Sequence, residues 1–217
     1  MSNERYLQAW KASPGYAGDL EIVKKAYAGN ARYLDQQILE PMFNLYGNAG
    51  LKRDTVVVFA GDHGEMHMER DQLTHATSGF DEAVEIPAAV RFPRDWPTGI
   101  HVKEQTPLHR IAELTEGVLA GSIHRENLSE KIQSLTDDVV ILRDCRNTIR
   151  GLRFKNKYKY LVDTASGERQ LFDLESDPDE LVNVALSRSE TTDEMEALYW
   201  THLPKYNWIP PYRCLPW

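Results

Sequence analysis

Cysteine is scarce in this 217-residue sequence, and long apolar runs and a surplus of basic residues are missing. The two cysteines, Cys145 and Cys214, are too few for a disulfide framework and lack the spacing of a metal-binding pair, so reduced thiols are expected. No segment approaches the roughly 20 apolar residues that a membrane-spanning helix needs. The net charge of −8 leaves no cationic excess to neutralise nucleic-acid phosphates. These absences predict a protein that binds neither membranes nor nucleic acid.

The composition is that of a folded globular protein. Apolar residues make up 41% of the chain and charged residues 27%. The first residues are polar and contain no signal-peptide core, which predicts a cytoplasmic location. A basic stretch at residues 150–160 is interpreted as the solvated face of a strand.

The first half of the chain shows one long helical pattern and two short strand patterns. Apolar residues recur every three or four positions over residues 19–46, which predicts a helix with Asp19 as its N-cap and a kink or restart at Pro41. Residues 55–60 and 88–92 are uninterrupted apolar runs. Such runs are typical of strands in a parallel sheet that helices cover on both faces.

The pattern changes to short strands beyond about residue 137, after a predicted helix at residues 107–119. Four strands separated by turn residues predict a small antiparallel meander, which a helix at residues 191–202 closes. The strands are expected at residues 139–142, 148–154, 158–163 and 170–174. We therefore expect an α/β fold, with an α/β part at residues 1–136 and a small antiparallel subdomain with a C-terminal helix and tail at residues 137–217.

The polar turn Gly61-Asp62-His63-Gly64 comes directly after the first predicted strand. Loops that follow the strands of α/β proteins are common sites of ligand binding. Asp62 offers a hard anionic oxygen and His63 a neutral nitrogen, while the glycines permit a positive φ and a close approach of the backbone to an ion. A metal-binding turn and a plain turn capped by an aspartate both fit these four residues.

The wider sequence resembles sulfatases of the alkaline phosphatase superfamily. In that family a hydrophobic strand runs into Ser-Asp-(His or Asn)-Gly-Glu, as in Ala60-Gly61-Asp62-His63-Gly64-Glu65, and a later Tyr-Glu-Glu-Ala motif resembles Phe80-Asp81-Glu82-Ala83. The stretch Leu171-Phe172-Asp173-Leu174-Glu175-Ser176-Asp177-Pro178-Asp179-Glu180, after Lys157-Tyr158-Lys159-Tyr160, resembles the C-terminal signature. The resemblance covers most of residues 20–200. It implies part of an alkaline-phosphatase-like α/β sandwich, followed by a small antiparallel sheet with a closing helix.

Several site residues are implied by this resemblance. Asp62 matches a carboxylate ligand of the active-site divalent cation, which is usually Ca²⁺ or Mn²⁺, and His63 matches the position next to it. His75 is closest to the position of a family lysine that binds the sulfate, so the resemblance implies a catalytic hydrogen bond from His75. His75 could equally be a ligand of a second metal, as in related phosphate-transferring enzymes, or a loop residue without a role.

The family's nucleophile motif is absent from the sequence. Sulfatases attack with a formylglycine made from the first residue of Cys/Ser-x-Pro/Ala-x-Arg, and neither cysteine lies in such a motif. No early strand carries the family's pair of metal-binding aspartates. The chain is therefore interpreted as the C-terminal half of a sulfatase, with the formylglycine expected in the absent N-terminal half. A two-stranded sheet with an open apolar edge also predicts that this half, or a partner polypeptide, completes the sheet.

The resemblance implies metal-dependent hydrolysis of sulfate esters, with a small sulfated substrate. Three alternatives stay open. The chain could belong to a phosphate or phosphonate ester hydrolase that takes a phosphorylated substrate, or to a two-metal phosphotransferase of the same superfamily. It could also be a catalytically inactive sulfatase-like module that serves binding or assembly.

Overall fold

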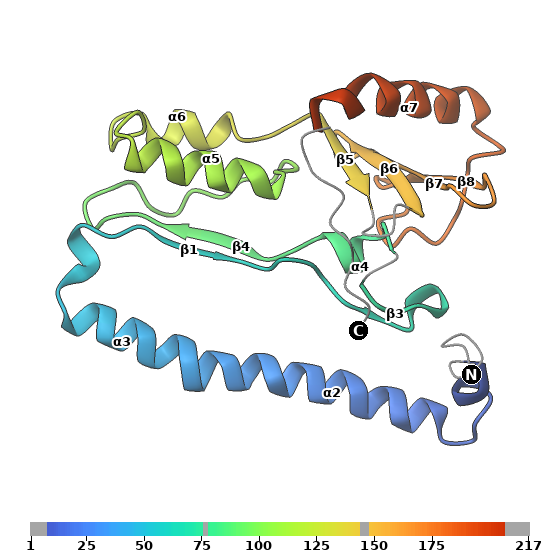
Figure 1. Cartoon of the computed structure of the whole chain (residues 1–217), viewed down its shortest axis with the longest axis horizontal. Helices are drawn as coiled ribbons and strands as arrows, with labels where there is room; N and C mark the ends of the chain where they lie inside the picture. Colours follow the sequence, from blue (N-terminus) through green and yellow to red (C-terminus); the bar gives the residue numbers. More distant parts are fainter. Residues whose placement is uncertain (1–7, 76–77, 144–147, 207–217) are drawn as a thin grey trace. The chain divides into compact units, whose positions relative to one another are not determined.

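The computed structural model describes residues 8–75, 78–143 and 148–206 (Figure 1). The chain divides into two compact units. The first comprises residues up to Thr55 together with Glu65–Thr74, and the second comprises Val56–Gly64 and the chain from His75 onward. The boundary at residue 136 that the sequence suggests does not coincide with this division and stays a prediction. Cys145, Cys214 and the tail after residue 206 lie outside the described residues.

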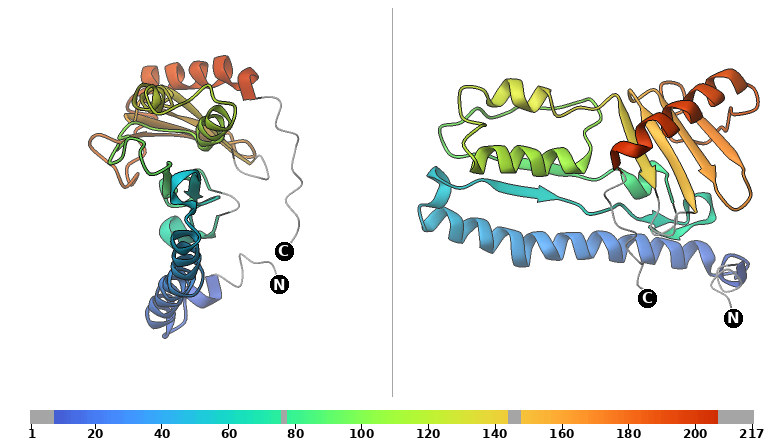
Figure 2. Two further views of the ribbon diagram at one scale, coloured as in Figure 1. Left: turned by 90° about the vertical axis from the view of Figure 1, so that its left-hand side faces the viewer. Right: turned by 45° about the horizontal axis from the view of Figure 1, so that its top comes forward.

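A long helix dominates the first unit (Figure 2). Helix α2 (Tyr16–Leu34) continues through a π-helical turn, η1 (Asp35–Leu39), into α3 (Glu40–Asn48), and a short 3₁₀ turn, η2 (Leu51–Arg53), follows. The predicted change at Pro41 is found as this π-helical turn and not as a separate helix start, because Leu39 and Glu40 keep helical dihedral angles up to the proline. The predicted N-cap is wrong. Gly15 occupies that position, and the Asp19 carboxylate accepts a hydrogen bond from Trp10 Nε1 at 2.9 Å.

A small hairpin completes the first unit. Its strands β2 (Met66–His67) and β3 (Leu73–Thr74) are joined by the 3₁₀ turn η3 (Glu69–Asp71). The hairpin contacts α2, where the rings of Tyr27 and His67 lie 4.7 Å apart. Two-residue strands in a polar segment carry too little apolar periodicity for the sequence to reveal them.

The second unit begins with a two-stranded ribbon of β1 (Val57–Ala60) and β4 (Ala88–Arg91). The predicted parallel arrangement is wrong, because these strands pair antiparallel. Gly61 N–H donates to the Pro87 carbonyl at 3.0 Å, so the connecting segment returns to the end of the ribbon that it left. A parallel pair would need a crossover to the opposite end, and the described part of this connection contains only the 3₁₀ turn η3 and the one-turn helix α4 (Asp81–Val84).

Two helices cover part of this ribbon. Helices α5 (Leu108–Leu119) and α6 (Leu128–Gln133) bury an apolar cluster against residues at the end of β4. Its buried members are Leu114, Leu128, Ile132 and Leu135, and Val90, Phe92, Trp96, Ile100 and Ile123 pack against them. The expected cover on both faces is not found in the described chain, because Val58 and Phe59 of β1 are 42% and 40% exposed.

The C-terminal part is the predicted antiparallel meander. Strands β5 (Val139–Arg143), β6 (Ile149–Phe154), β7 (Tyr158–Asp163) and β8 (Arg169–Asp173) pair in chain order. Helix α7 (Ser189–His202) packs on one face, and the 3₁₀ turn η4 (Leu203–Tyr206) follows it. Leu152, Tyr160, Leu171, Met195 and Tyr199 form the buried centre of this layer. Within the described part of the chain, no helix is long and apolar enough to cross a membrane.

Candidate metal centre

The turn after β1 is held at both ends against the segment that precedes β4. Gly61 N–H donates to Pro87, and Gly64 N–H donates to the Ala83 carbonyl at 2.9 Å. A Cβ on Gly64 would lie only 2.0 Å from the Glu82 carbonyl oxygen. Neither Gly61 nor Gly64 has the positive φ expected from the sequence, so a close backbone approach is what requires glycine at position 64.

The hydrogen bonds of His63 leave one ring nitrogen available to a metal. His63 Nδ1 lies 2.8 Å from the Gly64 carbonyl oxygen, which can only accept, so the proton belongs on Nδ1. Nε2 then keeps its lone pair, as in metal-binding histidines that donate their second nitrogen to a carbonyl.

Asp62 lies next to that nitrogen. The distance from Asp62 Oδ2 to His63 Nε2 is 3.6 Å, and His63 N–H donates to Asp62 Oδ1 at 3.1 Å. Two ligands of one cation, each about 2.0–2.6 Å from it, lie roughly 3 Å apart. The two side chains therefore need only a small movement to share an ion. The Asp62 side chain is 89% exposed, which leaves room for that ion.

The structure also brings His75 to this place. The rings of His63 and His75 are stacked, with centroids 3.4 Å apart and an angle of 19° between their planes. Each ring offers a nitrogen within 4.8 Å of the other's. All three residues predicted for the site thus lie in the second unit, with the two histidines in contact and the Asp62 carboxylate beside His63.

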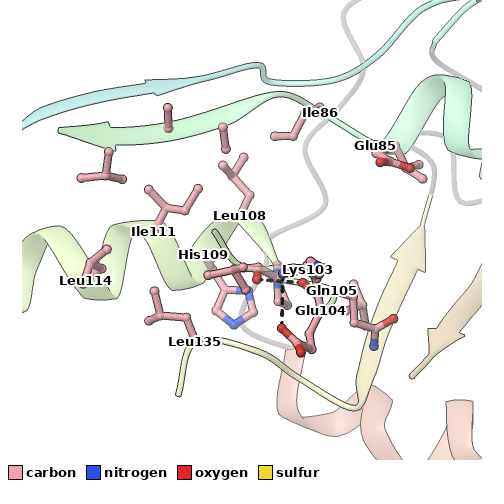
Figure 3. Close-up of a pocket in the computed structure, with 18 of the residues that line it drawn as sticks. Glu85, Ile86, Lys103, Glu104, Gln105, Leu108, His109, Ile111, Leu114 and Leu135 are labelled. Atoms are coloured by element: carbon pink, nitrogen blue, oxygen red, sulfur yellow. Dashed lines mark hydrogen bonds between the residues drawn. The ribbon is translucent and has the colours of Figure 1, made fainter. Parts of the chain in front are cut away.

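A cavity of about 1440 Å³ opens from this turn. Asp62, His63 and His75 line one part of it, and Lys103 and His109 contribute polar groups elsewhere (Figure 3). Apolar residues of the β4 and α5 region form much of the remaining wall, including Ile86, Val90, Phe92, Ile100, Leu108, Ile111, Leu114 and Leu135. The volume exceeds the roughly 300–1,000 Å³ of ordinary small-molecule pockets.

Residues 5–120 match the family model described as Sulfatase, which is more than half of the chain. The chain belongs to the sulfatase family. This sulfatase chain is 27% identical to a choline-sulfatase of Rhizobium meliloti (strain 1021) over 203 residues, which cover 82% of the chain and 37% of that relative. It is 30% identical to arylsulfatase K of Homo sapiens over 166 residues, which cover 67% of the chain and 30% of that relative.

The fold agrees with this assignment. The solved phosphonate monoester hydrolase of Agrobacterium radiobacter superposes on the sulfatase chain with a TM-score of 0.63 and 23% identity. The match covers 90% of the chain and 42% of that hydrolase, so the predicted alkaline-phosphatase-like α/β fold is confirmed. The sulfatase chain spans about a third of the length of the curated relatives named above.

The sequence interpretation missed a buried charged cluster behind the site. Lys159 is 0% exposed and Glu180 2% exposed, although the basic stretch around Lys159 suggested a solvated face. Burial raises the pKa of the Glu180 carboxyl, and the nearby Lys159 ammonium opposes that rise. The one signal of this burial in the sequence is the position of Lys159 between two tyrosines in a strand. The partners of Lys159, Asp81 and Glu180, become apparent only in the folded chain.

Proposed function

We propose that this sulfatase chain supplies part of the divalent-cation site of a sulfuric ester hydrolase, with Asp62 and His63 as ligands. The observation that carries the proposal is the 3.6 Å separation of Asp62 Oδ2 and His63 Nε2, in a turn fixed at both ends and open to a cavity. Oxygen and imidazole donors suit Mn²⁺, and Ca²⁺ would be held through Asp62 and further oxygen ligands.

Each of the three side chains has a defined task in this proposal. When bound, the cation polarises the non-bridging oxygens of the sulfate ester and supports the formylglycine nucleophile. Asp62 and His63 hold the cation, and the hydrogen bond from His63 Nδ1 to Gly64 keeps the ring in its binding tautomer. His75 would donate a hydrogen bond to the oxygens of the transferred group.

Metal binding tests the ligand assignment directly. Asp62→Asn or His63→Ala should weaken Mn²⁺ binding by more than the about 10–100-fold typical of supporting residues, because the first removes the anionic charge of a ligand and the second removes a ligand atom. Titration of the purified chain with Mn²⁺, followed by electron paramagnetic resonance, measures this affinity. Asp138→Asn and His124→Ala change exposed residues of the same unit and should leave it unaltered. Unchanged Mn²⁺ affinity in both site variants would refute the proposal.

We further propose that the nucleophile comes from polypeptide that carries the Cys/Ser-x-Pro/Ala-x-Arg motif and pairs with the free edge of β1. Two facts support this. The chain spans only about a third of the length of its curated relatives. Among the described residues β1 pairs with β4 alone, so its second edge is open, and its Val58 and Phe59 side chains are exposed. An unprotected apolar edge is one that soluble proteins avoid. Added chain would also fill part of the oversized cavity.

Phe59→Asp should abolish co-purification with that polypeptide. A carboxylate buried in a strand interface cannot be solvated, so its desolvation opposes pairing. The measurement is co-expression of the chain with a polypeptide that carries the nucleophile motif, followed by affinity purification and an assay on nitrophenyl sulfate. Leu186→Asp, at a 95% exposed residue, is the matched control and should leave pairing intact. Equal recovery with Phe59→Asp would rule out β1 as the pairing edge.

The same assay separates the alternative functions. A phosphate or phosphonate ester hydrolase would favour nitrophenyl phosphate or phosphonate over nitrophenyl sulfate. The likeness to the phosphonate monoester hydrolase shows the fold alone, and the curated relatives reported above are sulfatases. A two-metal phosphotransferase would bind two Mn²⁺ ions and use His75 as a ligand. An inactive module would pair without hydrolysing any of these esters. The cytoplasmic location stays a prediction.

A further inference from the structure

Four charged side chains form a cluster between α4 and the C-terminal sheet, in the second unit. Lys159 on β7 is fully buried, and its Nζ lies 2.5 Å from Glu180 Oε1 and also contacts the Asp81 carboxylate. Arg153 on β6 donates to both oxygens of Asp81 at 2.8 Å. The backbone N–H of Asp81 donates to Glu180 Oε2 at 2.9 Å. Asp81 is thus held through its side chain and its main chain at once.

Glu180 is itself fixed by a tight turn. It has a φ of 54°, in the left-handed region that costs a residue with a side chain strain energy. The Asp177 carboxylate stabilises this turn by accepting hydrogen bonds from the backbone of Leu181 and Val182 at 3.0 and 2.8 Å. The Asp-Pro-Asp-Glu segment is therefore a turn, and it directs the Glu180 carboxylate toward Asp81.

Asp81 connects this cluster to the metal turn. It is the first residue of α4, whose four residues are too few to form a stable helix without external contacts. The Ala83 carbonyl of α4 accepts the Gly64 N–H, and Glu82 O lies against Gly64 so closely that no Cβ fits. The position of α4 therefore fixes the position of Gly64, next to His63.

Energetic considerations favour a positioning role over a stabilising one. A buried ion pair usually adds little net stability compared with apolar side chains of the same size, because desolvation offsets the attraction. What charged partners can add is a defined geometry. We propose that Lys159 and Glu180 are positioning residues that hold α4 where it fixes Gly64, and thereby set the cation affinity of the Asp62–His63 turn. The part that concerns cation affinity rests on the proposed function.

The test is a charge-neutral double variant, Lys159→Met/Glu180→Met, in the full chain. It removes both buried charges, leaves the net charge unchanged and leaves Asp81 paired with Arg153. The Gly64 amide should then exchange its hydrogen about five- to tenfold faster, the equivalent of losing one hydrogen bond. Mn²⁺ affinity should fall by about tenfold, the lower end of the range for residues that orient a ligand. Amides of β8, such as Leu171, should exchange as in the wild type.

The matched control is Lys157→Met/Glu175→Met. This pair has a similar separation, 3.1 Å, and lies close by in the chain, but both side chains are exposed. It should change neither Gly64 exchange nor Mn²⁺ affinity. Wild-type exchange at Gly64 in a folded Lys159→Met/Glu180→Met protein would overturn the inference.

A second comparison decides the matter if the double variant does not fold. Glu180→Met and Glu180→Gln remove the same charge and leave Lys159 with Asp81, but only glutamine can still accept from the Asp81 N–H. Gly64 should exchange about five- to tenfold faster in Glu180→Met than in Glu180→Gln. Equal rates would refute the positioning role. If the rates differ while Asp62→Asn leaves Mn²⁺ binding intact, the positioning role stands and the proposed metal site fails.

Discussion

The single substitution Lys159→Met is expected to lower the free energy of unfolding of the second unit by about 3–5 kcal/mol, the usual cost of leaving a buried charge without its partner. Lys159 is fully buried and pairs with both Glu180 and Asp81, whereas Arg153 pairs with Asp81 and, at 3.8 Å, with Glu85. Glu180 would be left buried next to the Asp81 carboxylate without the cation that offsets its charge. Urea unfolding followed by circular dichroism measures the difference.

Two comparisons make this expectation specific. Lys157→Met removes an exposed lysine that pairs with Glu175, and should cost less than about 1 kcal/mol. If Lys159→Met lowered the free energy of unfolding by less than this value, Lys159 would not be the counter-ion of a buried carboxylate. The double variant with Glu180→Met should recover most of the lost stability, because no unpaired charge remains.

The loss in free energy of unfolding caused by Lys159→Met should also become smaller as the pH falls. Burial already raises the pKa of Glu180, and removing Lys159 takes away the charge that opposes this rise. An acid whose pKa is higher in the folded protein than in the unfolded chain favours folding below its unfolded pKa, and this contribution is lost as the pH rises through the folded pKa. Protonated Glu180 needs no counter-ion. The difference in free energy of unfolding between the variant and the wild type should therefore be smaller at pH 5 than at pH 8.

Gly64→Ala is expected to remove Mn²⁺ binding almost completely, with a loss of at least about 100-fold. The new Cβ would lie 2.0 Å from Glu82 O, 2.9 Å from Glu82 C and 3.2 Å from the Cα of Ala83. All three are backbone atoms, so no side-chain rotation can relieve the overlap, and the turn must move away from α4. A metal site holds its ion only with ligand distances within about 0.2 Å of their usual values, so a displaced turn no longer binds the cation well. Isothermal titration with Mn²⁺ gives the affinity.

Gly61→Ala is the graded control for this substitution. Its Cβ would meet the Ile86 Cβ at 3.3 Å, which is far less close than the 2.0 Å contact at Gly64 and needs only a small backbone adjustment. Mn²⁺ affinity should therefore fall less than tenfold, well short of the loss at Gly64. Wild-type affinity in a folded Gly64→Ala protein would show that the contact with α4 does not hold the turn.

The sequence predicted those parts of the fold that depend on local patterns. Short apolar segments between turn residues mark the four strands of the meander, and period-3.6 patterns mark α2 and α5. The direction of β1 relative to β4 could not be predicted, because an apolar run fits a parallel or an antiparallel neighbour equally well. The hydrogen bond from Gly61 to Pro87 decides it, and only the folded chain shows that contact.

The candidate site divides in the same way. The Asp62–His63 turn could be predicted because its residues are adjacent and follow a strand directly. The charged cluster that holds α4 could not be predicted, because Asp81, Lys159 and Glu180 are far apart in the chain and each suggests an ordinary surface residue. The tertiary fold brings them into contact, because the one-turn helix α4 packs against the C-terminal sheet.

Anomalous diffraction at the manganese edge, from crystals of the chain grown with Mn²⁺, shows directly which side chains hold the cation. If Asp62 and His63 are ligands, a peak lies within about 2.0–2.6 Å of an Asp62 carboxylate oxygen and of His63 Nε2. A fully occupied manganese ion with neither residue in its coordination shell would contradict this assignment.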